Sequence, residues 1–329
     1  MNRVAVQNIA ALVAAILLAM TAVARVTPGA TASVELPDVP APSVRLVDLP
    51  DGTKGIADRR GHVVPLRNYR HIVSGSSLVD EVLVVLAERE RIAAITEYGK
   101  KNSLPASVAS GLASHPGLSN IESLLSLKPD LVITNQVGDP APLERLEERG
   151  VQVFDLGDMR GLVTLMPNIE QIATLLGRPE DGRRYAEQLT RRLHRVAAGS
   201  APAGSAIYVS IYGGQIYGGA TGTSYHDVML AAGLTDAAAK RYSGWPNYTA
   251  EELLGLDPDF VFTSDGMNET LCRQPGLDRL HVCREPRRIL TLESELTGDP
   301  GPRLLEAAER LRDELDAFTA VTPVAGAPR

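Results

Sequence analysis

The sequence predicts an α/β fold of two doubly wound lobes joined by a long helical segment. Residues 71–157 alternate short apolar runs with amphipathic stretches, a pattern typical of strands and helices that alternate in a parallel sheet. Residues 162–198 then carry a helical pattern with no strand inside it. A third observation is a segment that occurs twice, as NIESLLSLKPDLVITNQ (120–136) and TAEELLGLDPDFVFTSD (249–265), once in each half.

The N-terminus has the features of an export signal. Arg3 precedes the apolar run 9–20, and small residues follow it, so residues 1–24 are interpreted as a signal peptide, with cleavage after residue 32 as the alternative. The apolar run is too short to span a bilayer comfortably, and no cysteine follows it for lipid attachment. We therefore expect a soluble exported protein whose residues 25–60 are a leader and the start of the fold.

The first half, residues 61–157, is predicted to be an N-terminal α/β lobe. Its strands are expected in the apolar runs that small or polar residues close, at 71–77, 92–99, 130–136 and 151–157. Its helices are expected between them, at 78–87, 120–127 and 142–150.

The segment 158–200 is predicted to be helical and to bridge the two halves. Apolar residues recur at helical spacing through 162–176 and again through 185–196. The sequence GRPEDG (177–182) interrupts this stripe, so we expect two helices or one broken helix.

The second half, residues 201–319, is predicted to be a C-terminal α/β lobe, followed by a tail at 320–329. Strands are expected at 206–213, 259–265 and 288–293, and helices near 225–233, 250–256 and 301–318. Cys272 and Cys283 are the only two cysteines, and in an exported protein they most simply form a disulfide.

The twin segment has eight identities in seventeen positions. Each copy is predicted to be a helix followed by a strand, with Asn120 or Thr249 as the N-cap, and Thr249 with Glu252 is predicted to form a capping box in the second copy. Glu122 and Glu251 recur in the first helical turn, where a carboxylate complements the partial positive charge of the helix N-terminus. That effect alone is one interpretation of the two glutamates.

Composition and motifs argue against several classes of function. The net charge of −7 and the absence of a long Lys/Arg run argue against a nucleic-acid partner. The sequence has no G-x-S-x-G, H-E-x-x-H or phosphate-binding-loop motif, so we predict that it is not an enzyme, although a secreted hydrolase is kept as an alternative. No His-rich loop indicates a bare zinc or manganese site, and no metal ligand is predicted.

Several stretches between about Gly55 and Phe318 have an order and spacing found in a known family. They are ADRRGHVVPL with RHIVSGSSLVDEVL, PGLSNIESLLSLKPDLVIT, the helical span 162–198, GATGTSYHDVMLAAGL and GWPNYTAEELLGLDPDFVF. Together they resemble the periplasmic substrate-binding proteins of ABC importers, in the class that carries vitamin B12, ferric siderophores and haem.

The resemblance implies two lobes bridged by one long backbone helix, with the ligand in the cleft between them. It also implies a periplasmic monomer that delivers a small metal chelate to an ABC permease with its ATPase. The ligand would be a ferric siderophore or a cobalamin-type corrinoid, with haem favoured less; it would contain iron or cobalt, and the protein would have no intrinsic cofactor. A ligand sensor or scaffold of the same fold, without transport, is the other alternative. Glu122 and Glu251 match the glutamates with which this family docks onto permease arginines.

The predicted ligand site follows from the rule that ligands lie beyond the carboxyl ends of the strands in open α/β sheets. The loops at those ends are rich in tyrosine, which suits a large or aromatic ligand. Trp245 in GWPNYTAEE matches a tryptophan that lines the cleft in the B12-binding branch. The candidate ligand-binding residues are Ser76, Tyr98, Gln136, Tyr212, Tyr217, Tyr242, Trp245 and Met267.

Overall fold

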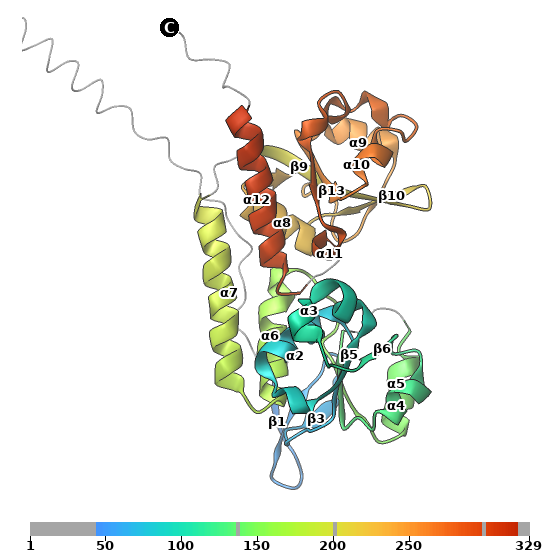
Figure 1. Cartoon of the computed structure of the whole chain (residues 1–329), viewed down its shortest axis with the longest axis vertical. Helices are drawn as coiled ribbons and strands as arrows, with labels where there is room; N and C mark the ends of the chain where they lie inside the picture. The colour runs from blue at the N-terminus through green and yellow to red at the C-terminus, as the bar shows by residue number, and fades with distance from the viewer. Residues whose placement is uncertain (1–43, 136–138, 200–202, 298–300, 322–329) are drawn as a thin grey trace, which may run out of the picture. The chain divides into compact units, whose positions relative to one another are not determined.

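The computed structural model describes residues 44–135, 139–199, 203–297 and 301–321 (Figure 1). It divides into two compact units, residues 1–33 and 34–329, and only the second contains described residues. The predicted signal peptide and most of the leader therefore lie outside the described residues, as does most of the tail.

A small antiparallel sheet precedes the N-terminal lobe. Its strands are β1 (Leu46–Asp48), β2 (Lys54–Ala57) and β3 (Val63–Pro65), paired in the order β1-β2-β3. The sequence analysis placed no strand here. The signal was the Asp-Gly pair at 51–52, a typical hairpin turn in which Gly52 adopts a φ of 80°.

The N-terminal lobe is built on a parallel sheet with the strand order β6-β5-β4-β7-β8. The strands are β4 (Ile72–Ser74), β5 (Ile92–Thr96), β6 (Ser114–His115), β7 (Leu131–Thr134) and β8 (Gln152–Asp155). The helices are α2 (Ser77–Leu86), α3 (Ala106–Ala109), α4 (Ile121–Ser126) and α5 (Ala141–Glu148), with a short 3₁₀ turn, η1 (Arg89–Arg91), and a π-helix, η2 (Gly99–Ser103). Every predicted strand and helix of this half is present, and the elements that were missed are β3, the short β6 and α3, and η1 and η2.

The bridging segment forms two helices, α6 (Leu162–Leu175) and α7 (Pro179–Gly199), which pack side by side (Figure 1). The break between the two helices lies at Gly177, whose φ of 77° ends α6. The end of α6 lies on the N-terminal lobe, where Arg91 Nη1 donates to the Leu176 carbonyl at 3.1 Å. Its start lies on the C-terminal lobe, where the Leu162 amide donates to Asp227 Oδ2 at 2.7 Å. The bridge is thus a pair of helices rather than one uninterrupted helix.

The close approach of these two helices depends on Gly182 of α7. A Cβ atom on Gly182 would lie 2.2 Å from Ala173 Cβ of α6. We expect Gly182→Leu to lower the free energy of unfolding by about 1–3 kcal/mol, because it overpacks a tight contact. Gly199→Leu on the same helix is the control, because nothing lies within 4 Å of a Cβ at that position. Urea unfolding midpoints measure both, and equal midpoints would contradict the packing argument.

The C-terminal lobe has a mixed sheet with the order β12-β10-β9-β13-β14, and β11 pairs with β9. The strands are β9 (Gly204–Tyr212), β10 (Gln215–Gly219), β11 (Leu234–Asp236), β12 (Asn247–Tyr248), β13 (Phe260–Ser264) and β14 (Ile289–Leu292). The helices are α8 (Ser224–Ala231), α9 (Ala250–Leu256), α10 (Asn268–Leu271), α11 (Ser294–Thr297) and α12 (Leu304–Val321), with 3₁₀ turns η3 (Leu277–Arg279), η4 (His281–Cys283) and η5 (Pro286–Arg288).

The antiparallel edge of this sheet is its main departure from the predicted pattern. β9 turns directly into β10 through Gly213 and Gly214, which both have positive φ and form a tight hairpin. β12 then pairs antiparallel with β10. The predicted strands at 206–213, 259–265 and 288–293 are confirmed. β11 and β12 were missed because they are only three and two residues long, and β10 was missed because its sequence, QIYGG, ends in two glycines and lacks a strand pattern.

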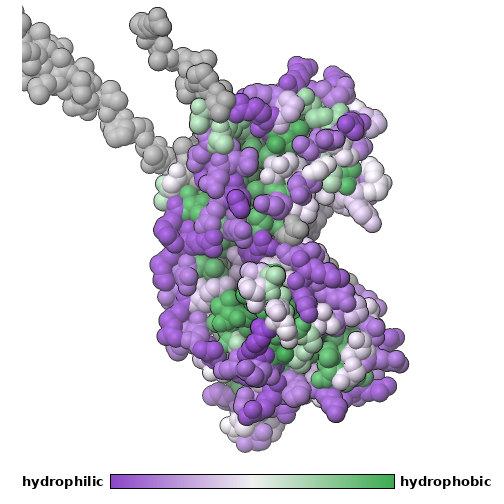
Figure 2. Space-filling view, viewed as in Figure 1, coloured by the Kyte–Doolittle hydropathy of each residue, from purple (hydrophilic) through white to green (hydrophobic). Residues whose placement is uncertain are grey.

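Both sheets are covered on two faces by buried side chains. One core cluster includes residues of both lobes and of α6, α7 and α12. A second cluster lies between the C-terminal sheet and α9, and a third between the N-terminal sheet and helices α4 and α5. The outer side of α7 is hydrophilic in Figure 2, as expected for an amphipathic helix that covers a core.

Candidate functional site

The twin segments occupy equivalent places in the two sheets. β7 lies between β4, the first strand of its sheet along the chain, and β8; β13 lies between β9, likewise the first, and β14. Helix α4 leads into β7 and helix α9 leads into β13. The repeat in sequence is therefore a repeat in topology.

Most of the identities in the twin segment have a role in folding. Leu124 of α4 and Leu253 of α9 are buried in the cores beneath their helices. Lys128 and Asp257, which align, are the only non-glycine residues with positive φ in the described part of the chain, at 50° and 36°. This left-handed residue before each proline ends the helix and turns the chain into the strand. The other buried or partly buried identities are Leu125, Leu254, Leu127, Leu256, Pro129, Pro258, Val132, Val261, Thr134 and Thr263.

The repeated aspartate anchors the first strand of each lobe. Asp130 accepts hydrogen bonds from the Arg70 and His71 amides, at 2.7 and 2.9 Å, just before β4. Asp259 Oδ2 accepts from the amide and the hydroxyl of Ser205, both at 2.8 Å, at the start of β9. These hydrogen bonds hold the pKa of Asp259 below its usual range. The same carboxylate thus does the same work in both lobes.

Glu122 and Glu251 are the exception among the identities. Both side chains are exposed, and each is the second residue of its helix. The caps are made by other residues: Asn120 Oδ1 accepts from the Ser123 amide, and Thr249 forms the predicted capping box with Glu252. No ion pair or hydrogen bond of either carboxylate is found within the described residues. The fold therefore gives little reason for the glutamate to recur.

Three of the predicted ligand-binding residues are exposed aromatics at strand ends. Tyr98 follows β5 and is 45% exposed, Trp245 lies in the loop before β12 and is 58% exposed, and Tyr212 ends β9 and is 78% exposed. Exposed aromatic side chains indicate a binding surface where they gather into a patch. Within residues 34–329, Figure 2 shows the surface hollowed between the two lobes, on the side away from α7.

The other predicted residues have partners within their own lobe. Tyr217 donates from its hydroxyl to Gln215 Oε1 at 2.8 Å, and Tyr242 donates to Glu252 Oε1 at 2.9 Å. Ser76 caps α2 by accepting from the Val79 amide at 3.4 Å, and Met267 precedes α10. Gln136 lies outside the described residues. Tyr242 in particular serves the start of α9, and its contacts do not bring it to Tyr98 or Trp245.

An aromatic cluster that the sequence analysis missed lies beside Trp245. Tyr225, at the start of α8, stacks on Tyr208 with a centroid distance of 3.4 Å and meets Trp245 edge-on at 5.4 Å. Phe262 of β13 packs against both tyrosines. Burial raises the pKa of Tyr225, and the nearby phenols of Tyr208 and Tyr98 raise it further.

A buried histidine was also missed. His115 ends β6 and is buried, and its Nε2 donates to the Ser74 carbonyl at 2.6 Å. Its Nδ1 has no hydrogen-bond partner in the described part of the chain. Because β6 is only two residues long, no strand pattern in the sequence indicates that His115 lies at this edge of the sheet.

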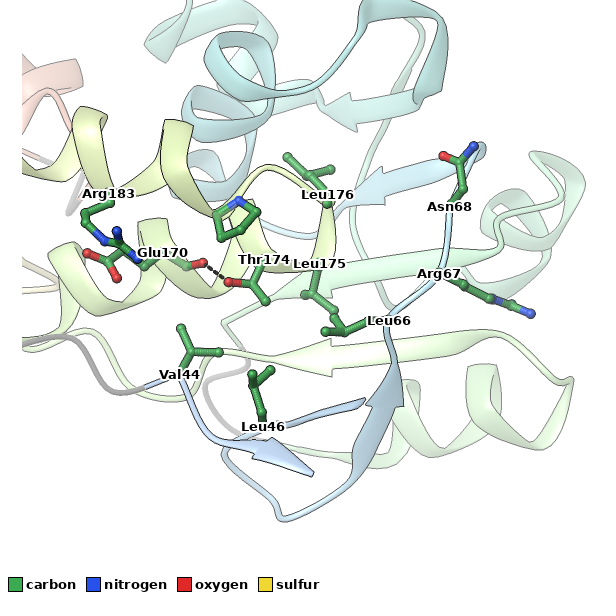
Figure 3. Close-up of a pocket in the computed structure, with 12 residues that line it drawn as sticks. Val44, Leu46, Leu66, Arg67, Asn68, Glu170, Thr174, Leu175, Leu176 and Arg183 are labelled. Carbon is green, nitrogen blue, oxygen red and sulfur yellow. Dashed lines mark hydrogen bonds between the residues drawn. The ribbon is translucent and has the colours of Figure 1, made fainter. Parts of the chain in front are cut away.

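The pocket in Figure 3 lies away from these residues. It has a volume of about 650 Å³ and is lined mainly by apolar side chains from the β1 region, the segment 66–68 and the α6–α7 turn. Glu170, which is 9% exposed, lines it, and burial raises the pKa of this carboxyl group. None of the predicted ligand-binding residues lines this pocket.

The described residues contain no group of three or more His, Cys, Asp or Glu side chains placed to hold a metal ion. Nor do they contain a helix that is both long and apolar enough to cross a membrane. Cys272 and Cys283 form the predicted disulfide.

A profile of the periplasmic binding protein family matches residues 72–293, more than half of the chain. The chain belongs to this family. This periplasmic binding protein is 23% identical over 209 residues to YvrC of Bacillus subtilis (strain 168), an uncharacterised ABC transporter substrate-binding lipoprotein. The match covers 60% of the chain and 65% of YvrC, slightly less than two thirds of that relative.

Two further similarities place this periplasmic binding protein among known ones. It is 23% identical over 201 residues to the vitamin B12-binding protein of Photorhabdus laumondii, a match that covers 60% of the chain and 70% of the relative. Its structure resembles the periplasmic haem-binding protein HutB of Vibrio cholerae, with a TM-score of 0.66 at 19% identity, over 75% of the chain and 99% of HutB. The second similarity confirms the predicted two-lobe α/β fold.

Proposed function

We propose that this protein is the solute-binding component of an ABC importer. It captures a bulky metal chelate in the periplasm, after its signal peptide is cleaved, and delivers it to a permease with its ATPase. The observation that carries the proposal is the pair of exposed glutamates, Glu122 and Glu251, at the same position of the same helix in each lobe. Two equivalent carboxylates suit a partner with an arginine for each lobe.

The proposed ligand is a corrinoid, a ferric siderophore or haem. Tyr225 and Trp245 meet edge-on, and Tyr98 is exposed at a strand end of the other lobe. Aromatic surfaces of this kind bind large flat molecules through apolar and stacking contacts. The names of the relatives, which bind vitamin B12 or haem, support a chelate of iron or cobalt. The metal would then arrive with the ligand, and the protein would need no intrinsic cofactor.

Titration of the purified mature protein with cobalamin, haemin and several ferric siderophores tests this proposal. One of them should bind with a dissociation constant in the micromolar range or below. Equilibrium dialysis against the coloured ligands measures this directly. Failure of all these chelates to bind would contradict the proposed ligand class.

Trp245 provides a specific signal because it is the only tryptophan in the chain. We expect the cognate chelate to quench its fluorescence by about half or more, since a bound aromatic or corrin ring would lie against the exposed indole. Free N-acetyltryptophanamide at the same absorbance corrects for light absorbed by the ligand. An unchanged protein signal at saturating ligand would place Trp245 outside the site.

A further inference from the structure

Helices α4 and α9, which carry Glu122 and Glu251 of the proposed function, pack against different kinds of structure in their lobes. In the N-terminal lobe the connection from β7 to β8 contains α5, eight residues long, and α4 packs against it. In the C-terminal lobe the connection from β13 to β14 has no comparable helix. It consists of the four-residue α10 and the turns η3, η4 and η5, and the disulfide Cys272–Cys283 closes it into a loop. We call residues 272–283 the disulfide loop.

The disulfide loop packs on the start of α9. Gly276, with a φ of 86°, lies so close that a Cβ there would be 3.3 Å from the Cβ of Ala250, the first residue of α9. Ala250 is the direct neighbour of Glu251. Leu277 and Leu280 of the loop are buried in the same core cluster as Leu253 of α9.

The disulfide loop also reaches the end of α9. His281 Nδ1 lies 3.0 Å from Asp257 Oδ1, and Asp257 is the C-cap of the helix with a left-handed φ of 36°. Val282, the next residue, is buried in the core cluster beneath the helix. The loop therefore contacts α9 at both ends and underneath.

These contacts matter because α9 is too short to be stable without packing. It has seven residues, and isolated helices shorter than about 12–15 residues are marginal in water. The support in turn lacks long regular structure, so its own order depends on its core leucines and on the covalent link. A disulfide stabilises such a segment mainly by reducing the conformational freedom of the unfolded chain.

We propose that the Cys272–Cys283 disulfide is a positioning device for Glu251, holding α9 in the orientation that meets the permease. The proposal rests on the docking role of Glu251. The proposed ligand-binding residues Tyr225 and Trp245 are not part of the disulfide loop, so we expect ligand binding to be independent of it. Loss of the link should therefore affect docking and spare ligand affinity.

The test is the double variant Cys272→Ala with Cys283→Ala in the mature chain, followed by hydrogen exchange of the α9 amides. Without the link, α9 should exchange about tenfold faster or more, because exchange reports the free energy of local opening. The α4 amides in the same molecule are the internal control and should not change. Unchanged exchange in α9 overturns the positioning proposal, whatever the transport result.

Two further measurements separate this proposal from the proposed function. The cysteine variant should bind the chelate identified in the titration above with unchanged affinity. Uptake of that chelate into proteoliposomes with the permease should be slower than with the wild type. His281→Ala, which keeps the disulfide and removes the contact with Asp257, should give a smaller change in the same direction. A loosened α9 with full transport overturns the positioning role. Full transport by Glu251→Arg, with the disulfide intact, overturns docking itself.

Discussion

Charge reversal of both repeated glutamates, Glu122→Arg with Glu251→Arg, is expected to abolish uptake and leave chelate affinity unchanged. If each glutamate meets a permease arginine, reversal puts two cations together, and such like-charge contacts cost several kcal/mol. We expect the rate of transport at limiting binding protein to fall by about 100-fold or more, as such a cost implies. Uptake of labelled chelate into proteoliposomes and equilibrium dialysis measure the two quantities.

The controls for this experiment come from the same chain. The variant Glu90→Arg with Glu314→Arg changes the net charge equally and replaces one exposed glutamate in each lobe. It should support normal uptake of the chelate. The folding of the docking variant should be almost unaffected, because Asn120 and Thr249 still cap the helices. Loss of the favourable charge at each helix start costs about 0.3–1 kcal/mol. Normal uptake by the docking variant would exclude the docking role and leave the helix-end effect as the explanation.

The twin segment shows how far the sequence could be interpreted without a structure. The buried strands and the capping box at Thr249 were predictable because they depend on local spacing, and the disulfide was predictable because the chain has only two cysteines. That Asp130 and Asp259 anchor the first strands was not predictable, because their partners lie 59 or 60 residues away in one lobe and 54 in the other. Only the fold distinguishes the identities that build the lobes from the glutamate that does not.

The predicted ligand-binding residues differ in how the structure places them. Tyr98, Tyr212 and Trp245 are exposed at or beside strand ends, as the loop rule led us to expect, and their role in binding stays a prediction. Tyr225 was not among the predicted residues because it lies at a helix start rather than in a loop, yet it meets Trp245 edge-on and stacks on Tyr208. Tyr242 was chosen by the same loop rule, yet its hydroxyl bonds to Glu252 in its own lobe. A loop position predicts nearness to a strand end but does not predict which way a side chain points.

The second large expected effect is a pH-dependent change in stability at Asp227, where α6 meets the C-terminal lobe. This buried residue of α8 accepts the Leu162 amide at 2.7 Å and so caps α6, whose own N-cap residue, Gly161, has no side chain to do so. Burial raises the pKa of Asp227 to about 6, against a smaller opposing effect of the Leu162 hydrogen bond and of His226. Helix α6 also favours a negative charge at its start. Burial is the stronger effect, so the ionised form is less stable in the folded protein than in the unfolded chain.

The sign of the pH dependence follows from that difference. Because the folded pKa lies above the unfolded value of about 4, the contribution of Asp227 to stability is full below pH 4 and is lost as the pH rises to about 6. Asp227→Asn keeps an oxygen that can accept the Leu162 amide and removes the charge. At pH 7 it should therefore raise the free energy of unfolding by on the order of 2 kcal/mol, since each pKa unit corresponds to about 1.4 kcal/mol.

Chemical denaturation at several pH values between 4 and 7.5 tests this prediction. The stabilities of Asp227→Asn and the wild type should converge near pH 4 and separate as the pH rises, because only the wild type has a carboxyl group to ionise there. Asp227→Ala is the control, since it removes the charge and the cap together and should lose about 1 kcal/mol relative to Asp227→Asn at every pH. Parallel pH profiles of Asp227→Asn and the wild type would show that Asp227 is already ionised without penalty. In that case the N-terminus of α6 and the Leu162 hydrogen bond would stabilise the ionised carboxylate enough to offset the full cost of burying it.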